Sequence, residues 1–236
     1  MPRRRTVPLI VAAAIAGCSA PPPPLRAVVE HEWVTSVLLG REAGDSRDVV
    51  TRWQRPVHYL AVDVEPRLRP VLDGAVAQIR AALAGMHAVT VEYVRASDPR
   101  LGLVGYANVW FVAPGRAARL AAAYGLYEPG ADADGWFTLE WNAAFELERA
   151  FVFVDPDLDD AWLRHTVLEE LFQVLGIAND SPLLADTVVF EGASLAGSHT
   201  ELSARDRQLL RLLYRELAPG ATAGDIAAAM ERCWRF

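Results

Sequence analysis

The stretch from Trp162 to Leu175 constrains the fold most, because it divides into two faces at helical spacing and runs directly into Gly176. Only Arg164 interrupts the division. A glycine in that place predicts the end of a helix. We therefore expect a helix with one face on a core, whose apolar face is Val167, Leu168, Leu171, Phe172, Val174 and Leu175 and whose polar face is Trp162, His165, Thr166, Glu169, Glu170 and Gln173.

Two interpretations of the polar face are open. In the first, it meets water, and the aspartates at 157, 159 and 160 cap the helix and interact with its dipole. In the second, the polar residues form a site. The segment Glu169 to Ser181, EELFQVLGIANDS, resembles the metzincin zinc-protease pattern H-E-x-x-H-x-x-G-x-x-H in spacing, leucines, glycine and final serine.

The resemblance assigns a role to each position of this segment. Glu169, Gln173 and Asn179 stand where the family has its three zinc-binding histidines, and Glu170 stands at the catalytic glutamate. Leu202 to Tyr214, LSARDRQLLRLLY, is similar to the metzincin block after the Met-turn and carries a capping box formed by Ser203 and Asp206. Val189 occupies the methionine position. The resemblance implies a zincin-like, metzincin-type α+β fold without the zinc ligands.

A second resemblance rests on the replaced positions themselves. E-E-L-x-Q-x-L-G-x-x-N-D-S, together with the earlier Arg52-Trp53-Gln54-Arg55-Pro56-Val57, resembles a bacterial domain-of-unknown-function family, family 2927. This resemblance spans about residues 50–217. It implies that the substitutions are a family feature.

The side chains at the replaced positions argue against zinc. Glu169, Gln173 and Asn179 offer oxygen and one negative charge, whereas zinc favours imidazole and thiolate. We therefore expect no cofactor. The alternative is another divalent metal, held by these oxygens or by a rearranged set that includes His165 one turn earlier. Without a metal, Glu170 has no activated water from which to take a proton as general base.

The N-terminus predicts export and lipidation. Three arginines at 3–5, an apolar run at 7–16 and Ile15-Ala16-Gly17-Cys18 form a signal peptide with a lipobox-like end. The apolar run is too short to span a bilayer, which needs about 20 residues. The lipobox implies cleavage before Cys18 and a lipid on its thiol. Ser19 after it implies outer-membrane sorting, so we expect a bacterial envelope protein anchored by lipid and facing the periplasm.

Charge and composition exclude other classes. The chain has 23 basic and 30 acidic residues, a net charge of −7, and losing residues 1–17 with their three arginines brings this to −10. That balance argues against a nucleic-acid partner. Lysine is absent, which excludes Schiff-base chemistry. Apart from Cys18, Cys233 is the only cysteine, so no internal disulfide is expected.

Periodicity predicts the order of the elements. Expected strands are residues 32–39, 59–64, 88–95, 107–113, 136–141 and 150–154, and residues 129–135 form a turn. Expected helices begin between 66 and 70 and end near 84, then cover 115–124, 159–175, 204–217 and 223–232. This order fits an α+β domain with a twisted mixed sheet, a helix after its first strand and C-terminal helices. We expect a signal peptide at 1–17, a lipidated tether and linker at 18–49, and the domain at 50–236.

These observations favour a lipid-anchored envelope protein that binds a peptide or protein in the former substrate cleft without cleaving it. The alternative is a metal-dependent, peptidase-like hydrolase with Glu170 as general base and oxygen ligands. A third hypothesis is a structural lipoprotein whose polar helix face meets only water.

Overall fold

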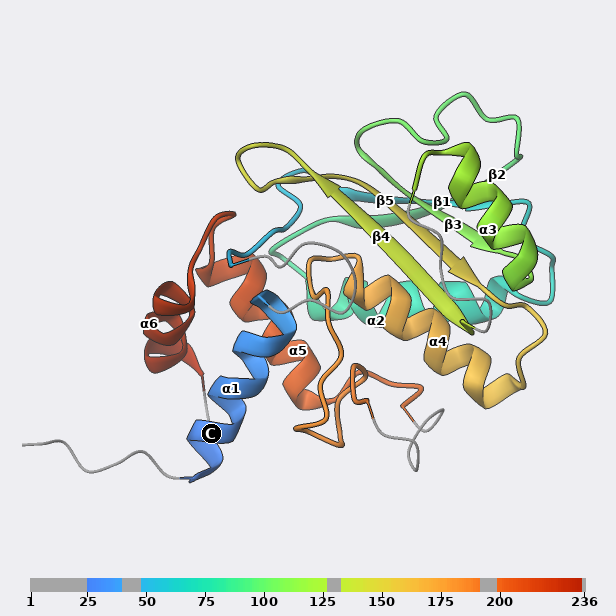
Figure 1. Cartoon of the computed structure of the whole chain (residues 1–236). Coiled ribbons are helices and arrows are strands. Elements are labelled where there is room, and N and C mark those ends of the chain that lie inside the picture. The colour runs from blue at the N-terminus through green and yellow to red at the C-terminus, as the bar shows by residue number, and fades with distance from the viewer. Residues whose placement is uncertain (1–24, 40–47, 127–132, 192–198, 235–236) are drawn as a thin grey trace, which may run out of the picture.

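Five strands form one mixed sheet in the order β2-β1-β3-β5-β4 in the computed structural model, which describes residues 25–39, 48–126, 133–191 and 199–234 (Figure 1). Neighbouring strands are parallel except β4, which runs antiparallel to β5 at one edge. The strands are β1 (Val57–Val62), β2 (Val89–Val94), β3 (Tyr106–Phe111), β4 (Gly135–Trp141) and β5 (Leu147–Val154).

Helices cover both faces of the sheet, as the alternation of its side chains requires. In β5, Val152 joins the core under α2 (Arg69–Ala82) and α4 (Asp160–Gln173). Its neighbour Phe153 points the other way, into a smaller core under α3 (Pro114–Ala123). Figure 1 shows α2 and α4 on one side of the sheet and α3 on the other.

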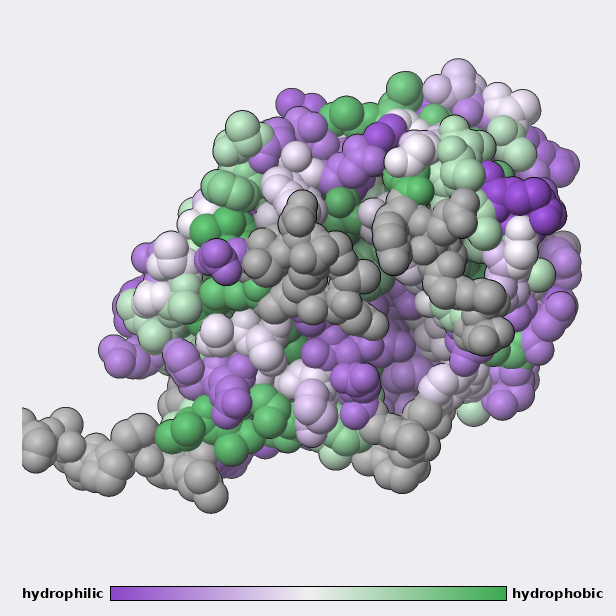
Figure 2. Space-filling model, viewed as in Figure 1, coloured by the Kyte–Doolittle hydropathy of each residue, from purple (hydrophilic) through white to green (hydrophobic). Residues whose placement is uncertain are grey.

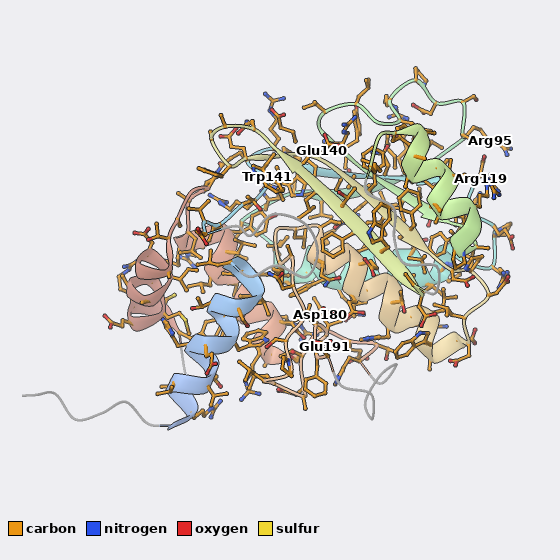
Figure 3. All side chains as sticks on the ribbon, viewed as in Figure 1. Arg95, Arg119, Glu140, Trp141, Asp180 and Glu191 are labelled. Carbon is orange, nitrogen blue, oxygen red and sulfur yellow. The ribbon has the colours of Figure 1, made fainter. Side chains whose placement is uncertain are left out.

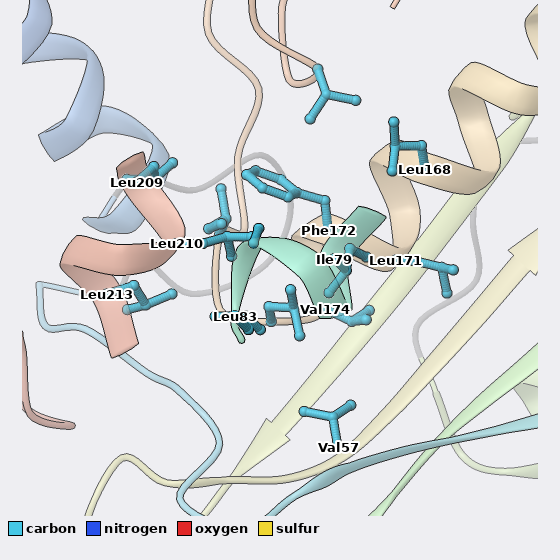
Figure 4. Packing of buried hydrophobic residues seen from close by; sticks show 14 of the residues in the cluster. Val57, Ile79, Leu83, Leu168, Leu171, Phe172, Val174, Leu209, Leu210 and Leu213 are labelled. Carbon is cyan, nitrogen blue, oxygen red and sulfur yellow. The ribbon is translucent and has the colours of Figure 1, made fainter. Parts of the chain in front are cut away.

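The larger core continues beyond the sheet into the C-terminal helices. In Figure 4, Ile79 of α2, Phe172 of α4 and Leu210 of α5 (Ala204–Arg211) lie in one cluster, and all three are fully buried. After α5 the chain continues as a π-helical turn, η1 (Leu212–Glu216), and then as α6 (Ala223–Cys233). These C-terminal elements pack in the same core as the C-terminal end of α4.

One expected element is wrong. Residues 32–39 were expected to form a strand, but they belong to helix α1 (Leu25–Leu39), which packs against α6 (Figure 1). The valines and threonine of this segment have high strand propensity. The buried residues Trp33, Val34, Val37 and Leu38 nevertheless recur at helical spacing, and they join the same core as the elements after residue 50. Tertiary packing therefore outweighs local propensity here.

The expected α+β class is confirmed, with a mixed sheet, a helix after β1 and helices at the C-terminal end. The other expected strands and helices are present with ends shifted by a few residues, and the last turn of the 204–217 helix is η1. Within the described ranges, no helix has both the length and the apolar character needed to cross a membrane. The signal peptide, Cys18 and most of the turn at 129–135 lie outside the described residues.

Candidate functional site

Helix α4 carries the residues of the candidate site and is anchored at its start. Asp159 caps it by accepting hydrogen bonds from the backbone N–H groups of Ala161 and Trp162 at 3.1 and 3.0 Å. The indole Nε1 of Trp162 donates to the carboxylate of Asp134 at 2.6 Å, just before β4 begins. The first turn of α4 is thereby tied to the edge strand of the sheet.

The end of α4 is held by the Arg52-Trp53 segment. Trp53 Nε1 donates to the carbonyl of Val174 at 2.8 Å, and the hydroxyl of Tyr214 donates to that of Leu175 at 2.9 Å. Gly176 has a φ of +111°, and a Cβ there would collide with the carbonyl oxygen of Thr51. Only glycine therefore lets the chain turn so close to residue 51, which explains two of the sequence motifs together.

Most of the polar face of α4 is buried. His165, Thr166, Glu170 and Gln173 are each 6% exposed or less, so the interpretation of this face as solvated surface is wrong. Strand β4 lies against it. A Cβ on Gly135 would collide with the side chain of Thr166 and lie 2.5 Å from Oε1 of Glu170. A glycine at the start of β4 therefore allows the strand to approach these side chains.

His165 links α4 to the segment that leads into α5. Its Nε2 lies 3.3 Å from a carboxylate oxygen of Glu169, and its Nδ1 lies 3.1 Å from the carbonyl oxygen of His199. Burial lowers the pKa of His165, but the hydrogen bond and charge of Glu169 and the carbonyl of His199 outweigh it, so the pKa is raised. Glu169 and His165 therefore form an ion pair whenever the imidazole is protonated.

The other two replaced ligand positions also have partners within the protein. The amide Nε2 of Gln173 donates to Asp180 at 2.8 Å. The amide Nδ2 of Asn179 donates to the carbonyls of Ser36 and Val37 in α1 at 3.2 and 3.4 Å, while its Oδ1 is buried without a hydrogen-bond partner. Figure 3 shows Asp180 beside the C-terminal half of α4.

The loop around Val188, in the place of the Met-turn, is held by the side chain of Asp206, which is fully buried. Its two carboxylate oxygens accept from the backbone N–H of Val188 at 3.3 and 3.2 Å, and one of them also accepts from Ser203 at 2.8 Å. The expected capping box is present. Burial raises the pKa of Asp206 to about 6, against the opposing effect of these hydrogen bonds. Val189, at the methionine position, is fully buried in the core.

The structure thus brings His165 together with Glu169, and Gln173 with Asp180, while Asn179 is directed toward α1. In the described part of the chain, no three His, Cys, Asp or Glu side chains have the geometry to hold a metal ion. The polar spacing on α4 pointed to His165, Glu169 and Gln173. The spacing does not report the contact of His165 with His199 or that of Trp162 with Asp134, because these partners lie 34 and 28 positions away.

Over α4, hydrophilic residues gather on the face of the molecule turned to the viewer in Figure 2. This surface lies below the edge strand β4. Most of β4 is partly exposed, and within the described residues it pairs on one side only, with β5. The candidate site is therefore the polar face of α4 together with the outer edge of β4.

Comparisons with known proteins show the family of the chain and a similar solved structure. The crystal structure of archaemetzincin (amzA) from Methanopyrus kandleri is similar to this chain, with a TM-score of 0.40 and 17% sequence identity over 67% of this chain and 95% of that chain. The model of the family described as "Protein of unknown function (DUF2927)" matches residues 31–232, so the chain belongs to this family. Comparison with the curated proteins gave no match.

Proposed function

We propose that this protein is anchored by lipid in the bacterial cell envelope and binds an extended peptide or protein segment along β4, over the polar face of α4, without cleaving it. One observation carries the proposal. The side chains at the three positions equivalent to zinc ligands make contacts inside the protein, with His165, Asp180 and the backbone of α1. A metal would have to displace these contacts in order to bind.

The edge of β4 supports an extended ligand. A strand that pairs on one side leaves alternate backbone N–H and C=O groups available to a further strand. Trp136, Phe137 and Leu139 give this strand partly exposed apolar side chains, which can contribute contact area. An added peptide strand would run beside α4, where the partly exposed side chains of Trp162 and Glu169 could contact it.

Site-specific photo-crosslinking in the bacterial envelope tests the binding proposal. A photo-reactive phenylalanine at Thr138 in β4 should give defined adducts with envelope peptides or proteins. The matched position is Arg119, which is exposed on α3 across the sheet and labelled in Figure 3. Adducts from Thr138 and none from Arg119 support the proposal. Equal labelling from both positions, or none from Thr138, would refute binding at β4.

The alternative is a metal-dependent hydrolase with Glu170 as general base. The observation in its favour is that Glu170 is buried directly beside the first residue of β4, where a substrate on the strand edge would pass. Elemental analysis of the purified protein and proteolysis by wild type and Glu170→Gln decide between the two. Stoichiometric metal with activity lost in Glu170→Gln would establish the hydrolase. Protein without metal and without activity would exclude it.

The lipid anchor is a separate part of the proposal and rests on the lipobox-like sequence at Cys18. Cys18→Ser should shift the protein from the membrane fraction to the soluble fraction of the envelope. Unchanged membrane retention of this variant would refute the anchor while leaving the peptide-binding proposal intact.

A further inference from the structure

We propose that a pocket between the C-terminal end of α2 and η1 binds the oxyanion of a small phosphorylated or carboxylated ligand, with Arg211 and Arg215 as the contacting residues and Arg52 behind them. This inference does not depend on the proposed function, because none of these residues belongs to α4 or β4. In the Arg52-Trp53 motif, Trp53 anchors the end of α4, and the proposed pocket gives a role to Arg52.

The pocket has a volume of about 630 Å³, within the usual range for small-molecule sites. On the α2 side, the pocket is lined by Met86 and by alanine and glycine residues, whose small side chains leave the space open. The opposite wall carries the chemistry. It consists of Arg211, Tyr214 and Arg215, so two arginines line this side of the pocket.

The positive charge at this place is not neutralised by the protein. Among the described residues, no carboxylate lies within ion-pair distance of Arg52 or Arg211, and Arg215 has only Glu216 at 4.0 Å. The chain as a whole carries a net charge of −7, so a group of unpaired arginines runs against its overall composition. An anionic ligand would provide the missing countercharge.

Arg52 and His87 present hydrogen-bonding atoms that the described residues leave unsatisfied. The guanidinium of Arg52 lies over the ring of Tyr214, 5.5 Å from its centroid, and one terminal nitrogen makes a long 3.4 Å contact to the carbonyl of Tyr214. Its buried Nε has no acceptor, and the buried Nε2 of His87 also lacks a partner. The centroids of the His87 and Tyr214 rings lie 4.6 Å apart.

The electrostatics of this group favour an anion. Burial lowers the pKa of Arg52, and burial together with the charge of Arg52 lowers the pKa of His87. A nearby anion would stabilise the charged form of each group, which burial disfavours. The cation–π contact with Tyr214 stabilises Arg52 but supplies no hydrogen-bond acceptor for Nε.

The backbone of the arginine wall is also unusual. Residues 212–216 form a π-helical turn, and such turns are rare and found mostly at functional sites. The wider turn sets the positions of Tyr214 and Arg215 relative to Arg211 on the preceding α-helical turn. The turn η1 thus supplies Tyr214 and Arg215 of the pocket wall.

The ligand chemistry follows from the arginines. A guanidinium donates two parallel N–H bonds to a planar or tetrahedral oxyanion, so phosphate and carboxylate are both suitable. Binding is non-covalent and needs no metal. The pocket volume admits a small molecule that carries one such group.

Titration of the purified full chain with inorganic phosphate, and separately with succinate, tests this site by NMR at an ionic strength held constant with sodium chloride. At least one probe should give saturable amide shifts in residues 81–86 and 211–216. The double variant Arg211→Gln/Arg215→Gln should weaken that binding about 10-fold or more. Both arginines are exposed, so this variant should fold as wild type does, which circular dichroism checks. Arg207→Gln, exposed on the same helix outside the pocket, is the matched control and should change the affinity by less than about twofold.

The outcomes separate the ligand classes. Saturation by phosphate and not succinate assigns a phosphorylated ligand, and the reverse assigns a carboxylated one. Absence of saturable shifts with both probes overturns the proposal. Equal weakening by Arg207→Gln and by the double variant also overturns it, because the effect would then be one of general surface charge.

Discussion

Replacing Glu30 tests whether α1 is part of the folded unit. This carboxylate is 1% exposed and lies where three elements meet. It accepts from Trp234 Nε1 at 2.8 Å, from Arg205 Nε at 3.0 Å and from Arg26 Nε at 2.9 Å. Trp234 follows α6 and Arg205 lies in α5, so one side chain of α1 connects it to both C-terminal helices.

The contacts give the size of the effect. Glu30→Ala leaves the buried indole N–H of Trp234 without an acceptor, which costs about 1–3 kcal/mol. Arg205 is 25% exposed and keeps Asp186, so its loss adds about 1 kcal/mol at most. We expect a loss of about 3 kcal/mol in the free energy of unfolding for Glu30→Ala. Glu30→Gln retains an acceptor for Trp234 and should cost about 1 kcal/mol.

Urea unfolding followed by circular dichroism at 222 nm measures these losses. Glu32→Ala is the matched control, exposed in the same helix, and should cost less than about 0.5 kcal/mol. Equal small losses for Glu30→Ala and Glu32→Ala would refute the reasoning and assign residues 25–39 to a linker.

The same residue has a pH signature. Burial raises the pKa of Glu30, but hydrogen bonds from Trp234, Arg26 and Arg205 outweigh it, so the pKa lies below its ordinary value of 4.5. A lowered pKa means that the ionised carboxylate stabilises the fold above about pH 4.5 and that this contribution is lost as the pH falls through the folded-state pKa. The difference between wild type and Glu30→Gln should therefore shrink in acid.

Three further changes test the frame of the site. Gly176→Ala should cost about 2–4 kcal/mol because of its positive φ and the collision with Thr51, whereas Gly74→Ala, in open space on α2, should be neutral or stabilising in the same urea assay. Asp206→Ala should cost about 2–4 kcal/mol, since buried backbone N–H groups lose their acceptor, while Asp225→Ala in the exposed capping box of α6 should cost about 1 kcal/mol. The raised pKa of His165 predicts a stabilising contribution that is fully present below about pH 6.5 and lost as the pH rises through the folded-state value. His165→Gln should lack it, and parallel stability profiles for this variant and wild type between pH 5 and 8 would contradict the ion pair with Glu169.

The sequence pattern predicted the type of a helix or strand correctly wherever burial in the core alone determined that pattern. The apolar runs of β1 and β5 and the helical spacing in α2 and α4 come from burial of these elements in the core, and all four have the expected type. Helix α1 did not follow, because its strand-forming residues are helical only through packing against α6 and the buried Glu30. No local pattern reports a contact between residues about 200 positions apart.

The site divides in the same way. Spacing on α4 identified His165, Glu169, Glu170 and Gln173 as one polar face, but periodicity cannot tell a solvated face from one buried under a strand. What buries it is Gly135, whose missing side chain lets β4 approach. That glycine had no signal in the sequence beyond a turn.

The residues at the three positions where the metzincin pattern has histidines are stabilised by partners within the protein. A buried polar group needs a partner, and each of the three positions has a side chain suited to the partner it meets. Glu169 is an acceptor beside the imidazole of His165. Gln173 and Asn179 each present an amide NH₂, which donates to the carboxylate of Asp180 in one case and to the backbone carbonyls of α1 in the other. The segment from Glu169 to Asn179 is therefore built to join α4, its following loop and α1.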